Sequence, residues 1–478
     1  MRASAGSPPD DGAQVVVIIA DGARPDTLAH AIGIGQLPAL ARLRSEGTLC
    51  SVTSAFPSVT GPAYAPFIMG RYPGNVGLPG LRWYDRSHKT AALPGHSRSY
   101  VGPEMRFVDS DIDGASPTIF ELARPSIGAL SVITRGLGKR ERIGQSLPFV
   151  ARAAIAHFRG NVKGWLAIDR SVGEEVARRL RTERLRFAFV ALTGIDKTSH
   201  SAGHEAPVVG DALRIVDETV AQIRRDAEAD GRWNRMHLWV GSDHGHSPVT
   251  AHEDLAGLIS EWGYDTLAHP WVFKRSADVA VMVSGNAMAH LYLDLDQRSR
   301  PWWPALGTRW AGLLENISGR ESVDLVILPT GPSSCQIRSR SRGVATLKWT
   351  ATRYTYCPET GDPLGAAEQI SLNDEEAYDA MLGTDYPDAL VQIARLSGSP
   401  RSGEIILSAA RNWDYRSKYE PIPHVSSHGA LHRDHMMVPL LLNRAPSGNP
   451  RRTVDVMPSA LKALGINAPG TLDGDSFL

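Results

Sequence analysis

Continuous apolar runs mark the main strands that the chain predicts. Residues 14–20, 185–192 and 236–240 are dominated by β-branched, aromatic and other apolar side chains, and 48–53 forms a shorter run of the same kind. Runs without polar alternation are typical of strands buried on both faces of a parallel sheet. The pattern therefore predicts an α/β fold built on a central, mostly parallel sheet.

Helices are predicted between these strands. Residues 207–229 carry apolar side chains three or four positions apart, at Val209, Leu213, Val216, Val220 and Ile223, which is the spacing of one helix face. Segments 37–43 and 147–158 also predict helices. Alternating strands and helices agree with a parallel sheet covered by helices.

The pattern changes between residues 262 and 420, where short alternating segments replace the long apolar runs. They include 287–295, 324–328 and a predicted hairpin of 345–349 with 353–356. We expect an inserted smaller α+β cap at 262–420, packed over the active site, with the chain returning to the core through 404–408. The core then comprises 14–261 plus 421–478, and the polar residues 1–13 form a flexible N-terminus.

Composition narrows the class of protein. The 478 residues contain 51 Lys+Arg and 51 Asp+Glu, so no overall charge favours nucleic acid, and no nucleic-acid-binding signature is found. Three cysteines, Cys50, Cys335 and Cys357, lie far apart and suggest neither a disulfide framework nor a thiolate metal site. The N-terminus lacks a signal-peptide pattern and no apolar run reaches membrane-spanning length, so we expect a cytoplasmic protein. Its oligomeric state is left open.

One local excess of positive charge stands out. Between residues 135 and 163 there are seven Lys or Arg residues and one acidic residue, Glu141, around the predicted helix 147–158. Such a segment suits peripheral contact with an anionic membrane surface. The alternative is a solvated cap or lid without a lipid partner.

The segment Phe56-Pro57-Ser58-Val59-Thr60-Gly61-Pro62 precedes a further predicted helix. A hydroxyl held between Pro and Gly at the start of a helix suits a nucleophile that faces an anionic substrate. Thr60 is therefore the candidate nucleophile. Ser and Thr are also common helix caps, so the alternative is that Thr60 only caps this helix.

Acidic residues follow three predicted strands, at Asp21, Asp196 and Asp243. Parallel strands bring their carboxyl ends to one edge of a sheet, and crowded carboxylates are relieved by divalent cations. His200 lies four residues after Asp196, and His244 follows Asp243. Four more histidines fall within residues 424–435, of which we expect at least one to bind metal. Each motif also has an alternative when it is taken alone. Asp21 could belong to an Asp-Gly turn without a chemical role, and Asp196 with His200 could be a solvent-exposed Asp/His pair.

These motifs together resemble the alkaline phosphatase superfamily, in its type I phosphodiesterase/nucleotide pyrophosphatase branch. The landmarks are the strand-Asp-Gly opening, F-P-S-V-T, G-R-Y-P-G-N-V-G, D-K-T-S-H-S-A-G, S-D-H-G, S-H-G, T-V-D-V-M-P and the ending D-G-D-S-F-L. The resemblance covers Val15 to Leu478, with weaker matches at 86–185 and 262–420. It implies a three-layer sandwich with a central, mostly parallel sheet, and a single catalytic domain.

The resemblance also implies the metal ligands. One divalent ion would be held by Asp196, His200 and His428, and the other by Asp21, Asp243, His244 and the Thr60 oxygen. Ligands of this kind favour Zn²⁺, with Mn²⁺ as the alternative. The implied reaction is hydrolysis of a small-molecule or lipid phosphate ester through a phosphothreonine intermediate at Thr60.

The chain departs from the family at one position. Leu81 stands where the phosphodiesterase branch has an Asn that holds a phosphoryl oxygen. The guanidinium group of Arg82 could instead donate two hydrogen bonds to the phosphoryl group, which would suit a more anionic monoester. The alternative is that Arg82 is a surface residue. The alternatives to a phosphodiesterase are therefore a phosphomonoesterase, a phosphoryl or phospho-headgroup transferase on the same site, and a non-catalytic binding module that kept the fold.

Overall fold

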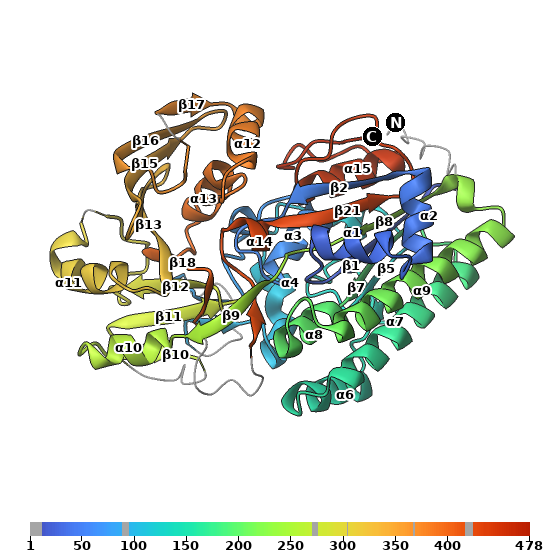
Figure 1. Ribbon diagram of the computed structural model, residues 1–478, viewed down its shortest axis with the longest axis horizontal. Helices are drawn as coiled ribbons and strands as arrows, with labels where there is room; N and C mark the ends of the chain where they lie inside the picture. Colours follow the sequence, from blue (N-terminus) through green and yellow to red (C-terminus); the bar gives the residue numbers. More distant parts are fainter. Residues whose placement is uncertain (1–11, 88–94, 270–275, 304, 367–368, 416–423) are drawn as a thin grey trace, which may run out of the picture.

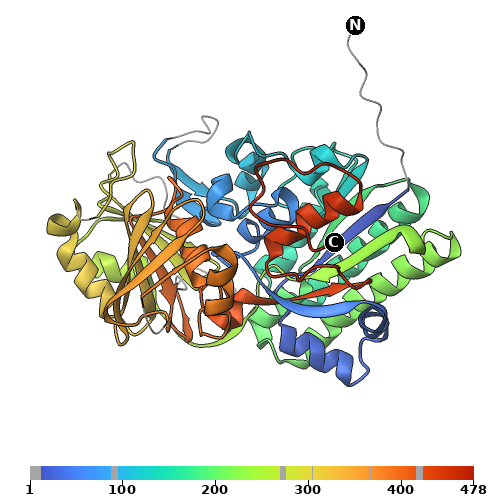
Figure 2. The ribbon, with the colours of Figure 1, turned by 90° about the horizontal axis from the view of Figure 1, so that it is seen from above.

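Two sheets organise the molecule, a core sheet and a second sheet in the inserted region, and they lie side by side (Figures 1 and 2). The computed structural model describes residues 12–87, 95–269, 276–303, 305–366, 369–415 and 424–478. Most of the expected flexible N-terminus, residues 1–11, therefore lies outside the described residues.

The core sheet has seven strands. Their order is β2 (Thr48–Thr53), β21 (Met437–Leu442), β8 (Met236–Gly241), β1 (Gln14–Ala20), β7 (Phe187–Leu192), β5 (Ser126–Ala129) and β6 (Arg142–Ile143). β1 pairs in parallel with β7 and β8, and β5 pairs in parallel with β6 and β7, whereas β21 is antiparallel to both β2 and β8. The predicted central, mostly parallel sheet is confirmed.

β1 is buried along its whole length because helices cover both faces of the sheet. Val15, Val17 and Ile19 pack into one apolar cluster, and Val16 and Ile18 pack into another on the opposite face. Side chains alternate between the two faces of a strand, so a strand buried on both faces shows no polar alternation. This is the physical reason for the apolar run at 14–20.

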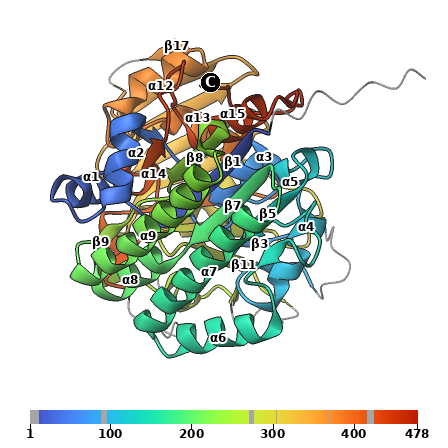
Figure 3. The same ribbon diagram turned by 90° about the vertical axis from the view of Figure 1, so that its right-hand side faces the viewer.

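The two helical layers complete the expected sandwich. One face is covered by α1 (Pro25–Gly33), α2 (Pro38–Glu46), α7 (Val162–Thr182) and α9 (Pro207–Ala229); Figure 3 shows α7 and α9 lying together across this face. The other face is covered by α3 (Ala65–Met69), α5 (Ile119–Leu122) and α15 (Val456–Ala463).

The inserted region forms its own nine-stranded sheet. The strand order is β10 (Thr266–Ala268), β11 (Val279–Ser284), β12 (Met288–Leu293), β18 (Ile405–Ala409), β13 (Val323–Gly331), β14 (Ser334–Ser339), β15 (Gly343–Trp349), β16 (Tyr354–Gly361) and β17 (Ile370–Leu372). α10 (Leu255–Glu261), which precedes the expected boundary at residue 262, packs with α11 (Gly307–Ser318) in one apolar cluster, and α12 (Asp374–Leu382) and α13 (Ala389–Ser397) pack in another. The predicted hairpin is confirmed as β15 and β16, joined at the pair Trp349 and Tyr354.

One predicted connection is wrong. Residues 404–408 were expected to return the chain to the core, but β18 lies in the inserted sheet between β12 and β13. Its residues are apolar and buried on both faces, and such a run indicates a central strand without indicating which sheet it joins. The return to the core sheet is made instead by β21.

Within the described parts of the chain, every helix is too short or too polar to cross a bilayer.

Candidate active site

Three carboxylates converge at the carboxyl edge of the core sheet. Asp21 follows β1, Asp243 follows β8, and Asp196 lies in the first turn of α8 (Gly194–Ala202), just after β7. β8, β1 and β7 are neighbours in the sheet, and all three carboxylates are buried. The geometric expectation from the strand ends is therefore confirmed, because parallel strands deliver their carboxyl ends to one edge.

Thr60 reaches the same place from the loop after β2. Its Oγ1 donates to Asp21 Oδ1 at 3.3 Å and lies 3.1 Å from His244 Nε2. The capping alternative is wrong: the short 3-10 turn Pro62–Tyr64 begins after Gly61, has no side-chain cap, and leads into the five-residue α3. Thr60 therefore faces a carboxylate and an imidazole rather than backbone N–H groups.

A first group of donors surrounds Thr60 and comprises Asp21, Asp243 and His244. His244 Nε2 lies 3.4 Å from Asp21 Oδ1 and 3.5 Å from Asp243 Oδ2. Among the described residues, Asp243 Oδ2 is buried without a hydrogen-bond partner. Tyr64 donates its hydroxyl to Asp21 Oδ2 at 2.9 Å and so orients that carboxylate.

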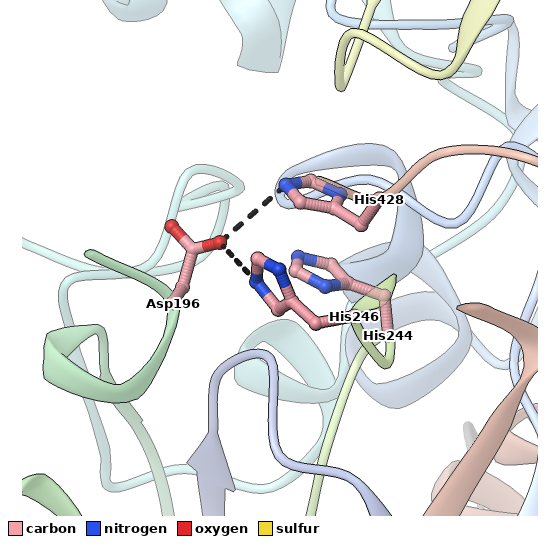
Figure 4. A group of neighbouring side chains, drawn as sticks. All are labelled: Asp196, His244, His246 and His428. Atoms are coloured by element: carbon pink, nitrogen blue, oxygen red, sulfur yellow. Dashed lines mark hydrogen bonds and ion pairs between the residues drawn. The ribbon is translucent and has the colours of Figure 1, made fainter. Parts of the chain in front are cut away.

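A second group comprises Asp196, His244, His246 and His428, and Figure 4 shows these four side chains pointing toward one another. His200 is not one of the four, although its ring also approaches Asp196. Asp196 Oδ1 lies 3.1 Å from His200 Nε2, 3.0 Å from His246 Nε2 and 3.4 Å from His428 Nε2. His246 was not among the predicted ligands. Its position two residues after His244 in Asp-His-Gly-His was the only signal in the sequence, and the resemblance did not assign it a role.

Hydrogen bonds orient the four imidazoles of these groups. Nδ1 of His200, His244 and His428 lies 2.9, 3.0 and 2.9 Å from the carbonyl oxygens of Ser426, Gly245 and Ser58, and a carbonyl can only accept, so Nδ1 donates in each case. His246 Nδ1 lies 3.2 Å from Ser426 Oγ, whose own proton goes to Ser247 O. All four rings therefore direct Nε2 toward the carboxylates. Metal-binding histidines are commonly oriented in this way, by a hydrogen bond from the other ring nitrogen to an oxygen acceptor.

These atoms fit divalent cations. Burial lowers the pKa of His246 to about 3 and holds the pKa of His428 well below its ordinary value, so both rings are neutral at pH 7. With Nδ1 protonated, each Nε2 then presents a lone pair to Asp196 Oδ1. Contact between a lone pair and a carboxylate is repulsive unless a cation lies between them. Three imidazole nitrogens and carboxylate oxygens are donors that suit Zn²⁺.

The first group favours proton binding. Burial, followed by the nearby charge of Asp21, raises the pKa of Asp243 to about 8. Burial alone would lower the pKa of His244, but the charges of Asp243 and Asp21 outweigh it and raise that pKa to about 9. Because Asp243 raises the pKa of His244 only while it is charged, the two side chains compete for a proton at pH 7.

Lys197 is a further charged residue of the site that sequence reasoning missed. Its Nζ lies 2.7 Å from Asp196 Oδ2. Burial would lower the pKa of Lys197, but Asp196 and Asp21 raise it. A positive charge accordingly lies beside the Asp196 group even without a metal.

Arg82 lies at the junction of the core and the inserted region. It is half-buried in β3 (Arg82–Tyr84), and its Nη1 donates to Val283 O of β11 at 3.5 Å. Leu81 packs near Gly61, where an added Cβ would meet its side chain at 3.2 Å. The apolar Leu81 side chain thus borders the residue after Thr60, and the predicted role of Arg82 in substrate binding stays a prediction.

The inserted region contributes one wall of the site. The β11–β12 turn bonds to the loop of His428, where Ala287 N donates to His428 O at 3.1 Å. A Cβ at Gly285, which has φ 59°, would lie 3.1 Å from His428 Nδ1. Only glycine lets this turn approach the imidazole so closely.

Fold and site together define an alkaline-phosphatase-like α/β protein with a buried Asp/His cluster suited to metal. The model of the type I phosphodiesterase/nucleotide pyrophosphatase family matches residues 15–300. The chain belongs to this family.

Relatives agree with this assignment. Ectonucleotide pyrophosphatase/phosphodiesterase family member 7 from Homo sapiens is 27% identical over 199 residues, which cover 41% of this chain and 41% of that protein. The Rattus norvegicus protein of the same name is 23% identical over 215 residues, 45% of this chain and 46% of the relative. The chain thus aligns with less than half the length of these two relatives.

Solved structures share the whole fold. Phosphonoacetate hydrolase from Sinorhizobium meliloti 1021 has a TM-score of 0.55 at 18% identity, covering 95% of this chain and 97% of that one. Murine ectonucleotide pyrophosphatase/phosphodiesterase 5, in an inactive form with AMP, has a TM-score of 0.55 at 12% identity and covers 96% of both chains. These likenesses establish the fold.

Proposed function

We propose that this protein is a metal-dependent phosphoric ester hydrolase that acts on a small-molecule or lipid phosphodiester through Thr60. The observation that carries the proposal is the position of Thr60 Oγ1, 3.3 Å from Asp21 Oδ1 and 3.1 Å from His244 Nε2. A nucleophile needs an acceptor for its proton and a group that stabilises its charge, and both lie within reach.

Two cations are proposed, with zinc favoured and manganese as the alternative. Asp21, Asp243, His244 and the Thr60 oxygen would hold one. Asp196, His200 and His428 would hold the other, joined by His246 on the distances given above. When bound, such ions polarise phosphoryl oxygens and lower the pKa of the Thr60 hydroxyl.

The residues of the chain then perform two displacements. Thr60 gives up its hydroxyl proton and its oxygen attacks phosphorus; the bond from phosphorus to the departing alcohol breaks, and the alcohol leaves after taking a proton. A water molecule next attacks the phosphothreonine, which releases the phosphate product and restores the Thr60 hydroxyl. Tyr64 holds Asp21 in place throughout by its 2.9 Å hydrogen bond.

The test compares bis-p-nitrophenyl phosphate with p-nitrophenyl phosphate, each with Zn²⁺ and with Mn²⁺. Thr60→Ala should lower kcat by at least about 10³-fold, because it removes the attacking oxygen. Thr60→Ser is the matched control and should keep a large part of the activity. Turnover by Thr60→Ala equal to that of the wild type would exclude the nucleophile, and absence of any bound metal would favour the non-catalytic module instead.

The same assay addresses Leu81 and Arg82. If Arg82 binds the phosphoryl group, Arg82→Gln raises KM for the monoester more than for the diester; if it only holds Val283 of the inserted region, both substrates respond equally. Addition of an alcohol acceptor separates hydrolysis from transfer, since a phosphoryl or headgroup transferase would yield the new ester.

The cytoplasmic location is likewise a proposal. It is supported by the three cysteines, which are all free thiols in the structure, as is usual in a reducing compartment. Fractionation of cells that express the protein, followed by thiol labelling before and after lysis, would test it.

A further inference from the structure

Helix α6 (Leu147–Phe158) exposes an apolar stripe to solvent. Its largest members are Leu147 at 86%, Phe158 at 72%, Ile155 at 55% and Val150 at 50% exposure. With the exposed Ala151 and Ala154, they follow the spacing i, i+3, i+4, i+7, i+8 and i+11, which places them on one helix face. Isolated exposed apolar residues are ordinary, but a continuous stripe on one helix is not.

The opposite face of α6 already holds the helix on the core. Phe149, Ala153 and Ala156 pack into the apolar cluster between the sheet and α7. The exposed stripe is therefore not needed to attach α6 to the protein. The helix is apolar on two sides, and one of them has no partner among the described residues.

Exposed cations flank the stripe on one side. Arg152 lies on α6, and Arg159 and Lys163 follow it directly. Lys139 and Arg140 are exposed as well but lie toward the other end of α7, where Arg140 O accepts from Arg179 Nη1 at 2.8 Å. In the part of the chain that the structure describes, none of the five pairs with a carboxylate within 4.0 Å. Glu141 is the one acidic residue between positions 135 and 163.

We propose that α6 is a docking helix for an anionic phospholipid surface. The exposed stripe would enter the boundary between headgroups and acyl chains while the flanking cations meet lipid phosphates and carboxylates. A second copy of this chain is a poorer occupant, because a two-fold interface would bring Arg152, Arg159 and Lys163 of both copies close together. The inference goes beyond hydrolysis, since it assigns a surface and its partner.

The position of α6 determines which side of the protein would face the lipid surface. Asn161 ends the turn after α6 and caps α7, whose first turns contact the active-site helix: Asp169 accepts from Gly194 N at 2.6 Å. Trp165 of α7 lies under Lys197 Nζ, 5.9 Å from the ring centroid. α6 also lies beside α7 and α8 at the same end of the molecule in Figures 1 and 3. Docking through α6 would therefore bring the Asp196 side of the site toward the lipid.

The experiment measures binding of the purified full chain to sedimenting vesicles. Vesicles of phosphatidylcholine with 30 mol% phosphatidylserine are compared with pure phosphatidylcholine, at low salt and at high salt. The proposal expects binding to the anionic vesicles that weakens with salt, and at least a tenfold weaker association for the double variant Ile155→Ser/Phe158→Ser.

A matched control is available elsewhere on the surface. Ile34 is exposed to the same extent as Ile155, 55%, but lies at the end of α1, so Ile34→Ser should bind vesicles like the wild type. Circular dichroism melts check that all variants stay folded. No binding to anionic vesicles, or equal loss for Ile34→Ser and the double variant, would overturn the proposal. So would a dimer in sedimentation velocity that dissociates on the α6 substitutions, because the stripe would then be a self-association surface.

Discussion

At the scale of single residues, His246 changes the picture of the second metal group. The predicted ligands Asp196, His200 and His428 would leave a fourth position for water or substrate, as catalytic zinc sites do. His246 Nε2, 3.0 Å from Asp196 Oδ1, is a further imidazole nitrogen at this carboxylate and would be available to the same ion. The ring is fully buried, so its orientation is set by the protein and not by solvent.

Substitution of His246 tests this role. His246→Gln keeps a hydrogen-bonding side chain near Asp196 but removes the imidazole donor, and should weaken Zn²⁺ binding about 100-fold. The measurement is competition with a chromogenic chelator, supported by the absorption spectrum of the Co²⁺-loaded protein. His290→Gln is the control, because His290 is also buried but binds Pro79 O at 2.9 Å in the inserted region. Wild-type affinity in His246→Gln would show that the ring only positions Asp196.

Proton release provides a second test at this scale. The pKa of Asp243 is raised to about 8 and that of His244 to about 9, so this pair binds a proton at pH 7. A cation bound by these groups displaces that proton, because a ligand must be deprotonated. Titration calorimetry in buffers of different ionisation enthalpy should therefore show proton release on metal binding at pH 7, and less release above pH 9. Release independent of pH would contradict these assignments.

At the scale of elements, the backbone N–H groups at the N-terminus of α8 are bound by a side chain of a neighbouring helix, α7. Thr193 does not cap α8 with its side chain. Asp169 of α7 accepts instead from Thr193 N at 3.1 Å and Gly194 N at 2.6 Å. The first turn of α8 carries Asp196, so α7 positions a metal ligand that it does not itself contain.

Asp169→Ala should therefore affect both stability and metal binding. It leaves two backbone N–H groups without an acceptor, which costs about 1–3 kcal/mol each if they stay buried, and it loosens the turn that holds Asp196. Asp217→Ala is the matched control, since Asp217 is buried and accepts from Leu40 N at 2.8 Å at the start of α2, away from the site. Both variants should lower Tm, but only Asp169→Ala should weaken Zn²⁺ affinity. Equal affinities would remove the proposed positioning role.

The elements also show what sequence patterns can and cannot predict. Val15 to Ile19 predicted a strand buried on both faces, because burial on both faces requires an apolar side chain at every position of the run. β18 was equally recognisable as a strand, but its place between β12 and β13 depends on partners far along the chain. For the site, Asp21, Asp196 and Asp243 could be predicted because strand ends meet at one edge. His246 could not, because its role depends on the direction of a side chain, set by Ser426 180 positions away.

At the scale of the whole molecule, the two donor groups join distant parts of the chain. Asp21 and His428 belong to the beginning and end of the folded region, and the inserted sheet contacts the His428 loop through Ala287. A bound cation should therefore stabilise the core and the inserted region together. Ligand binding at 100 times its Kd stabilises a protein by about 2.7 kcal/mol.

Zinc should accordingly raise Tm, and a chelator should reverse the increase. Calorimetry should show one cooperative transition that shifts with zinc concentration, and Asp196→Asn should reduce the shift because it takes away the carboxylate that the imidazoles of His200, His246 and His428 approach. Thr60→Ala is the comparison variant and should keep most of the shift, since it removes one weak oxygen donor. A Tm that does not respond to zinc in the wild type would argue against metal sites in this cluster.

The place of β21 in the core sheet has a consequence for synthesis of the chain. Among the described strands, β2 pairs only with β21, and their contact joins Cys50 to Leu440 across 390 positions. At roughly 5–20 residues per second, the ribosome takes about 20–80 s to cover that distance. During this time β2, and later one edge of β8 once that strand has been made, carry unpaired backbone groups that can cause association between nascent chains. Folding inside the cell should therefore depend on chaperones that bind the growing chain until its last strand emerges.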